Sequence, residues 1–443
     1  MPPKKKQPRG LKRSLAKPAK DAETPTASDS SNKRIKTEDN SVVPPKSEAD
    51  AAPAEDTRTV EIDADEEDEV GILKSLFDTA VAKHESGDIE GAEDLFRGCV
   101  HECDKILRIH DGAIPPSSDS PADAPTSTDM TISAPLPSEF HLVYGNALLQ
   151  LGLCLRAGQK MKDDVKSGYD SFMEYLREAR ERLEIGLEWA IEEKADEFRI
   201  RASLCRVCLE QATECYEVIE NGTNVDGANT FASAAKNFLD IESVLVRDFK
   251  SEENNALLLS TVLDFGSSCQ RYGDVLESWE GTQEWVGIAQ KLFEKVLDAS
   301  SSTSPLARDA LAALGGCSLC LAIHQLEDDA EEHDPAVITR QLEEGLSYFE
   351  RAEKLAGQEL LSTPFVPLLL LMGECLVNLG NMYDQSNPDG DDDTRSEEMY
   401  KRAIECFNMI TMIDATALPP QFAEFVNEWE KDFAAEDVKG ETE

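Results

Sequence analysis

Two Cys-x-x-Cys pairs, Cys205 with Cys208 and Cys317 with Cys320, have the spacing that zinc and redox sites use. A four-cysteine zinc site would need both pairs to converge, and a thioredoxin-like site would need a strand–helix–strand context. Each pair instead lies inside an apolar run of helical character, IRASLCRVCLEQA and LAALGGCSLCLAI. We therefore expect buried thiols and predict neither a metal site nor a redox centre.

The tetrapeptide HECD at 101–104 begins like the HExxH signature of zinc proteases, but Lys105 stands where the second histidine is needed. The sequence also lacks GxxxxGK[ST] and GxSxG motifs, and its six histidines offer little for acid–base catalysis. We predict that the protein is not an enzyme and has no catalytic, cofactor-binding or metal-binding residue. The alternative is a zinc protein that uses the two Cys pairs, which stoichiometric zinc in purified protein would support.

The cysteines belong to helical stripes that organise the chain. Between Gly87 and Leu107, small or apolar residues recur at steps of three and four and so share one helix face. They are Ile89, Ala92, Phe96, Cys99, Cys103 and Ile106. Residues 70–83 carry a similar stripe, and Gly87-Asp88 supplies a turn and an N-cap. Ala80, Ala92 and Phe96 then match a tetratricopeptide hairpin, in which short side chains let two helices approach and the aromatic fills space toward the next hairpin.

The same signature recurs five times after residue 140. The sets are Gly152 with Ala179 and Leu183, Ala212 with Ala234 and Phe238, Gly266 with Ala289 and Phe293, Gly315 with Gly345 and Phe349, and Gly380 with Ala403 and Phe407. The intervals vary, and acidic insertions at 327–334 and 386–394 lengthen the turns. We predict an all-α fold, a degenerate tetratricopeptide-like α-solenoid with a disordered N-terminal tail.

Composition predicts the remaining organisation. Residues 1–60 lack apolar periodicity and read as a disordered basic tail, followed by an acidic run at 61–69 and the first hairpin at 70–109. Residues 110–138, rich in Pro, Ser and Asp, read as a disordered loop. The repeat region is expected at 139–433, with an acidic tail at 434–443. The last helix of the repeat region, 421–433, is expected to cap the stack or, alternatively, to bind a partner.

Charge is distributed unevenly. The net charge is −44, but residues 1–36 hold eleven Lys/Arg against three Asp/Glu, so this head carries +8 and the rest carries −52. Phosphate repels an acidic body, so we predict no direct binding to nucleic acid or membrane. Eleven cysteines, an odd number, with no signal peptide or apolar span of about 20 residues, favour a reduced, intracellular protein.

Two basic clusters in the head fit the acidic grooves of a nuclear import receptor. They consist of Lys4, Lys5 and Lys6, and of Lys33, Arg34 and Lys36. We therefore predict a nuclear protein with an import receptor among its partners.

Three features together resemble a fungal family, the enhancers of translation termination, also described as nuclear negative regulators of a prolyl-hydroxylase-like oxygenase. They are the acidic run, the string GCVHECDKILRI at 98–109, and the strings LVNLGNMYD and EEMYKRAIECFNMI between 376 and 410. The resemblance covers roughly residues 61–412. It implies a non-enzymatic, tetratricopeptide-like nuclear adaptor that binds the carboxy-terminal domain of a 2-oxoglutarate- and iron-dependent oxygenase. It also implies roles in hypoxic transcription and accurate translation termination.

An alternative function follows from the charge alone. An acidic nuclear scaffold would also suit a chaperone or escort of basic proteins such as histones or ribosomal proteins. Recovery of such proteins in place of an oxygenase would favour the alternative.

Overall fold

The computed structural model describes residues 69–110, 135–160, 165–195, 197–217, 224–251, 254–327, 333–386 and 394–440. These ranges are helical, with no strand among them. The helices are α1 (Glu69–Glu85), α2 (Ile89–His110), α3 (Ser138–Lys160), α4 (Val165–Glu193), α5 (Phe198–Glu217), α6 (Val225–Phe238), α7 (Ile241–Val246), α8 (Asn255–Val275), α9 (Trp279–Ala299), α10 (Pro305–Glu327), α11 (Pro335–Ala356), α12 (Val366–Ser386), α13 (Thr394–Ile413) and α14 (Pro420–Gly440). The all-helical prediction is confirmed.

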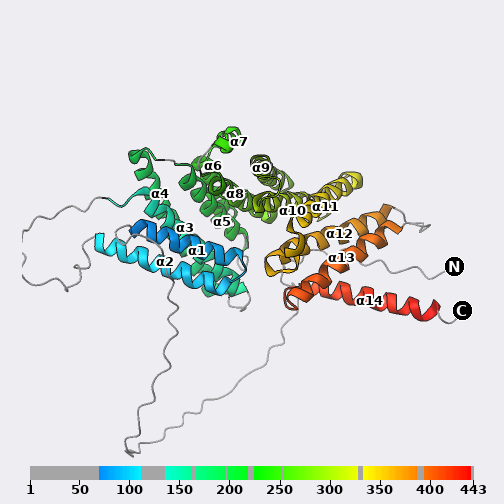
Figure 1. The fold of residues 1–443 in the computed structure, drawn as a ribbon. Helices are drawn as coiled ribbons and strands as arrows, with labels where there is room; N and C mark the ends of the chain where they lie inside the picture. Colours follow the sequence, from blue (N-terminus) through cyan, green and yellow to red (C-terminus); the bar gives the residue numbers. More distant parts are fainter. Residues whose placement is uncertain are drawn as a thin grey trace, which may run out of the picture. The chain divides into compact units, whose positions relative to one another are not determined.

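The helices pack as successive pairs (Figure 1). The pairs are α1–α2, α3–α4, α5–α6, α8–α9, α10–α11 and α12–α13. The first helix of each pair also contacts the first helix of the next, from α1 through α3, α5, α8 and α10 to α12. This arrangement is repeat-like, because each pair buries its apolar faces against its neighbours along the chain.

Capping residues set the ends of several helices. Asp88 accepts a hydrogen bond from the Gly91 N–H at 3.0 Å and so caps α2, while Gly87 forms the turn before it with φ +86°. Ile89, predicted on the buried stripe, is instead 43% exposed, and it is the first residue of α2. Ala92, Phe96, Cys99 and Cys103 are buried as expected.

Close approach within the pairs depends on glycine. A Cβ on Gly315 would stand 2.6 Å from Cε1 of Phe349, and a Cβ on Gly345 would stand 3.2 Å from the Gly315 carbonyl oxygen. These residues were predicted to face each other. The ring therefore covers the glycine of its own pair. Phe407 also reaches the next element, since it stacks on Phe422 of α14 with ring centroids 4.8 Å apart.

Three of the predicted small-residue positions are wrong in detail. In α3 it is Gly145, not Gly152, that faces Leu183, because a Cβ on Gly145 would stand 2.5 Å from Cγ of that leucine. In α12, Gly373 faces Phe407 and Gly380 faces Tyr400. In α6, Ala235 is buried at 2% exposure, whereas Ala234 is half-buried.

α14 continues the packing beyond the last pair. Its residues Phe422 and Phe425 are buried, and Phe425 and Trp429 lie against Tyr400 of α13 with ring centroids 6.0 and 5.5 Å apart. The helix therefore covers α13 with its aromatic stripe. Its backbone extends to Gly440, past the expected end at 433.

Two helices are long and apolar enough to cross a bilayer, namely α10 and α12. The expectation that the chain lacks such a span was therefore wrong. In the structure, 67% of the apolar window in α10 and 56% of that in α12 are buried. Their composition is accounted for by their position in the core, where first helices contact neighbours on several sides.

Candidate functional site

Polar contacts join the first helices of successive pairs, and we call this set the first-helix ladder. It consists of Glu139–Arg199 and Arg156–Glu214 between α3 and α5, Arg206–Asp264 and Glu210–Arg271 between α5 and α8, and Asp274–Cys320 between α8 and α10. Each contact joins two neighbouring pairs. Directional contacts of this kind favour one register over others, so we infer that the ladder fixes how the four pairs from α3–α4 to α10–α11 sit on one another.

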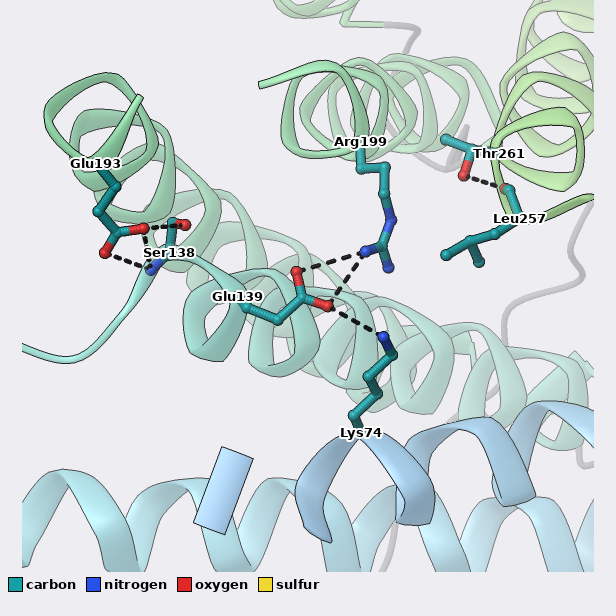
Figure 2. Close-up of polar contacts among 7 residues, drawn as sticks. All are labelled: Lys74, Ser138, Glu139, Glu193, Arg199, Leu257 and Thr261. Atoms are coloured by element: carbon teal, nitrogen blue, oxygen red, sulfur yellow. Dashed lines mark hydrogen bonds and ion pairs between the residues drawn. The ribbon is translucent and has the colours of Figure 1, made fainter. Parts of the chain in front are cut away.

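Glu139 is the junction of three pairs (Figure 2). Nη1 of Arg199 on α5 lies 3.1 and 3.4 Å from its two carboxylate oxygens. Nζ of Lys74 on α1 lies 3.8 Å from Oε1. The three side chains are between 24% and 45% exposed, so water screens their charges and each ion pair contributes about 1 kcal/mol or less.

Glu193 joins the end of α4 to the start of α3 within the second pair (Figure 2). It is the last residue of α4, and its carboxylate accepts hydrogen bonds from the Ser138 N–H at 3.3 Å and the Ser138 hydroxyl at 2.6 Å. Ser138 begins α3, where the first N–H groups have no partner within the helix. Thr261, drawn in the same view, donates to the Leu257 carbonyl at 2.9 Å within α8.

Glu210 is the most buried acid of the ladder, at 2% exposure. Its Oε2 accepts a hydrogen bond from Nη1 of Arg271 at 2.9 Å, and its Oε1 accepts one from the Ser268 hydroxyl at 3.2 Å. Both oxygens are therefore satisfied, which is the condition under which a carboxylate is tolerated inside a protein. Arg206, one turn earlier on α5, pairs with Asp264 at 2.9 Å.

The two Cys-x-x-Cys pairs are buried free thiols, as expected. Cys205 donates to the Ala235 carbonyl at 3.1 Å, whereas Cys320 donates to Oδ1 of Asp274 at 3.2 Å, so the pairs have separate partners. Burial raises the pKa of Cys208 to about 11 and holds that of Cys205 well above its ordinary value. Protonated thiols are poor nucleophiles and poor redox groups.

Among the residues that the structure describes, one group of side chains has the composition of a metal site. The ligand atoms of Asp274, Cys320 and His324 lie within 4.8 Å of one another. Sequence reasoning missed this group. The Cys-x-x-x-His spacing within α10 was visible, but Asp274 lies 46 residues before Cys320 on a different helix.

The predicted nuclear localisation residues lie outside the described residues. They are Lys4, Lys5, Lys6, Lys33, Arg34 and Lys36. Their role stays a prediction. His101, from the HECD tetrapeptide, is exposed on α2, whereas Cys103 is buried in the core, so the two do not share a face.

Known proteins resemble this chain over part or most of its length. Enhancer of translation termination 1 of Yarrowia lipolytica is 23% identical over 350 residues, which cover 76% of this chain and 81% of that protein. The negative regulator of ofd1 of Schizosaccharomyces pombe is 27% identical over 146 residues, which cover 33% of this chain and 30% of that protein. A solved structure of Nro1, described as a hypoxic regulator of sterol synthesis and nuclear import adaptor, is 20% identical. The similarity covers 82% of this chain and 94% of the Nro1 chain, with a TM-score of 0.48.

The profile of one family matches residues 26–283. The match includes the GCVHECDKILRI string at 98–109 and ends before the strings between 376 and 410. Because it spans more than half of the chain, this protein belongs to the Nro1 family, which is described as nuclear pore complex subunit Nro1.

Proposed function

We propose that this protein is a non-enzymatic nuclear adaptor that binds a prolyl-hydroxylase-like 2-oxoglutarate- and iron-dependent oxygenase and that serves translation termination and hypoxic gene regulation. Membership of the Nro1 family is the observation that carries the proposal. The relatives include an enhancer of translation termination and a negative regulator of ofd1.

The architecture supports an adaptor rather than a catalyst. Pairs of helices joined through the first-helix ladder form a scaffold whose polar groups are used in holding neighbouring pairs together. The thiols of Cys205 and Cys208 have raised pKa values, which makes them poor nucleophiles. Outside residues 1–36 the chain carries −52, and such a charge steers a basic segment of a partner toward it.

Two finer points belong to the proposal. The segment of the oxygenase that is bound is its carboxy-terminal domain, and an import receptor binds the basic clusters of the head. The contact with the import receptor would carry the protein into the nucleus.

The test is affinity purification of the tagged protein from cells grown at normal and low oxygen, followed by mass spectrometry. We expect a 2-oxoglutarate oxygenase to be enriched over the tag alone. Removing the carboxy-terminal domain of that oxygenase should abolish its recovery. The proposal is contradicted when no oxygenase is recovered at either oxygen level.

The acidic charge favours a second candidate, an escort of basic proteins. It predicts recovery of histones or ribosomal proteins, with binding that weakens steeply as salt is raised. Repeating the purification at two salt concentrations separates the candidates, because a specific oxygenase complex should survive the higher salt.

A further inference from the structure

Asp274, Cys320 and His324 form a small polar cluster where α8 meets α10. Asp274 lies in the last turn of α8, and the other two lie in the last two turns of α10. Cys320 and His324 are four residues apart, so they project from one face of α10. The cluster therefore brings together side chains from two neighbouring pairs, α8–α9 and α10–α11.

The distances within the cluster are close to those of a metal site. Sγ of Cys320 lies 3.2 Å from Oδ1 of Asp274, and Nε2 of His324 lies 3.9 Å from the same oxygen. Tetrahedral zinc with ordinary bond lengths separates its ligand atoms by about 3.5 Å. All three ligand atoms lie within 4.8 Å of one another, so they are near the separation at which they would share one ion.

The donor set and its surroundings also fit. One thiolate, one imidazole and one carboxylate match the preferences of Zn²⁺, and three protein ligands leave a fourth position for water. Cys320 is 3% exposed, whereas the side chains of His324 and Asp274 are 19% and 31% exposed. The cluster is therefore held by the core on one side and open to solvent on the other, which gives an ion a way in.

We propose that Asp274, Cys320 and His324 bind one zinc ion that joins α8 to α10. In the structure, the Cys320 thiol donates to Asp274, and the His324 ring is 3.1 Å from the Asp274 carbonyl oxygen. Binding replaces the thiol proton with Zn²⁺ and releases that proton to solvent, so binding weakens as pH falls. The ion would add a cross-link between two neighbouring pairs and so extend the ladder at Asp274.

The test uses the full-length protein, stripped of metal with a chelator and titrated with Co²⁺, a spectroscopic substitute for Zn²⁺. We expect one equivalent of Co²⁺ to produce a thiolate-to-cobalt charge-transfer band, which Zn²⁺ then abolishes by displacement. The band should be absent in Cys320→Ala. Cobalt affinity should fall by at least about tenfold in His324→Ala and in Asp274→Asn, since even loss of an outer partner has effects on that scale.

Cys317→Ala is the matched control. Cys317 is another buried thiol on α10, three residues before Cys320, and it is not part of the cluster. Its variant should give the wild-type band. Far-ultraviolet circular dichroism checks folding. If Cys320→Ala unfolds, His324→Ala, at a partly exposed position, takes its place as the test of the site.

Three results with the wild-type protein and the variants of the cluster would overturn the site. They are the absence of a band in the wild-type protein, a band that persists in Cys320→Ala, and a change of less than tenfold in both His324→Ala and Asp274→Asn. Loss of the band in Cys317→Ala would assign the metal to a different thiol and would overturn it equally. The cluster would then be a hydrogen-bonded contact between α8 and α10.

Discussion

The ring of Phe293 on α9 occupies the space in which a side chain on Gly266 of α8 would lie. A Cβ on Gly266 would come within 2.6 Å of Cε1 of Phe293 and 3.1 Å of two further ring atoms. Phe293 is fully buried, so the ring has no open space to move into. The approach of the two helices thus depends on the absence of a side chain at position 266.

Gly266→Ala should therefore destabilise the protein, although alanine is the better helix former. We expect a loss of about 1–3 kcal/mol from overpacking. Gly287→Ala on α9 is the matched control, because nothing lies within 4 Å of a Cβ at that position. It should stabilise the protein by up to about 1 kcal/mol. Thermal unfolding followed by circular dichroism measures both changes. A stabilised Gly266→Ala would show that the contact between α8 and α9 leaves room for a side chain at position 266.

Arg271 and Glu210 should respond unequally to mutation, because their side chains are 46% and 3% exposed. Arg271→Ala leaves a buried carboxylate with only the Ser268 hydroxyl, and we expect a loss of about 3–5 kcal/mol. Glu210→Gln keeps a neutral acceptor and leaves Arg271 able to reach water, so a loss of about 1–2 kcal/mol is expected.

The double variant and a surface pair complete this test. Adding Glu210→Gln to Arg271→Ala should recover part of the loss, since the stranded charge is removed. Arg177→Ala, which breaks the exposed Arg177–Glu174 pair, should change stability by less than about 0.5 kcal/mol. Equal losses for the two single variants in chemical denaturation would contradict the assignment of the buried charge to Glu210.

The helix pairs could be predicted from the sequence because their burial is periodic. Steps of three and four identify a stripe whatever it packs against. The same periodicity explains the errors in the facing glycine. Gly145 and Gly152 are seven residues apart, as are Gly373 and Gly380, and seven residues are about two turns. Both members of each couple lie on the same face, so spacing alone does not select between them.

The first-helix ladder could not be predicted in this way. Glu139 and Arg199 are 60 residues apart, and their contact depends on how α3 and α5 align. Charged residues occur throughout these helices, so composition gives no sign of which ones face a neighbouring pair. The Asp274 cluster was missed for the same reason, although two of its members are four residues apart.

His141 should make stability depend on pH. Burial, reinforced by Arg182 and His110 and opposed by Glu193, lowers the pKa of His141 to about 4 from its ordinary value of 6.5. The unfolded chain therefore binds the proton more readily than the folded one. The contribution is complete above pH 6.5 and is lost as the pH falls toward 4.

His141→Gln removes this titration and isolates its effect. Other acidic and basic groups change with pH in both proteins, so the difference in Tm between wild type and variant reports the histidine. We expect the Tm of the wild type minus the Tm of the variant to decrease from pH 7.5 to pH 5. A difference that stays constant over this range would mean that His141 is protonated equally easily in both states.

Nuclear accumulation should depend on the second basic cluster. Replacing Lys33, Arg34 and Lys36 with alanine removes the K-R-x-K arrangement whose charges an import receptor is expected to bind. We expect the fluorescently tagged protein to shift from nucleus to cytoplasm. Further replacement of Lys4, Lys5 and Lys6 should complete the shift.

The control removes the same charge from the helical region. Lys105, Lys291 and Lys354 are exposed on α2, α9 and α11, and their replacement with alanine lowers the net charge by the same three units. A protein with this change should stay nuclear, because the change leaves both basic clusters intact. Equal mislocalisation of the two variants would mean that import responds to overall charge, and wild-type localisation after loss of both clusters would mean that the protein enters the nucleus bound to a partner.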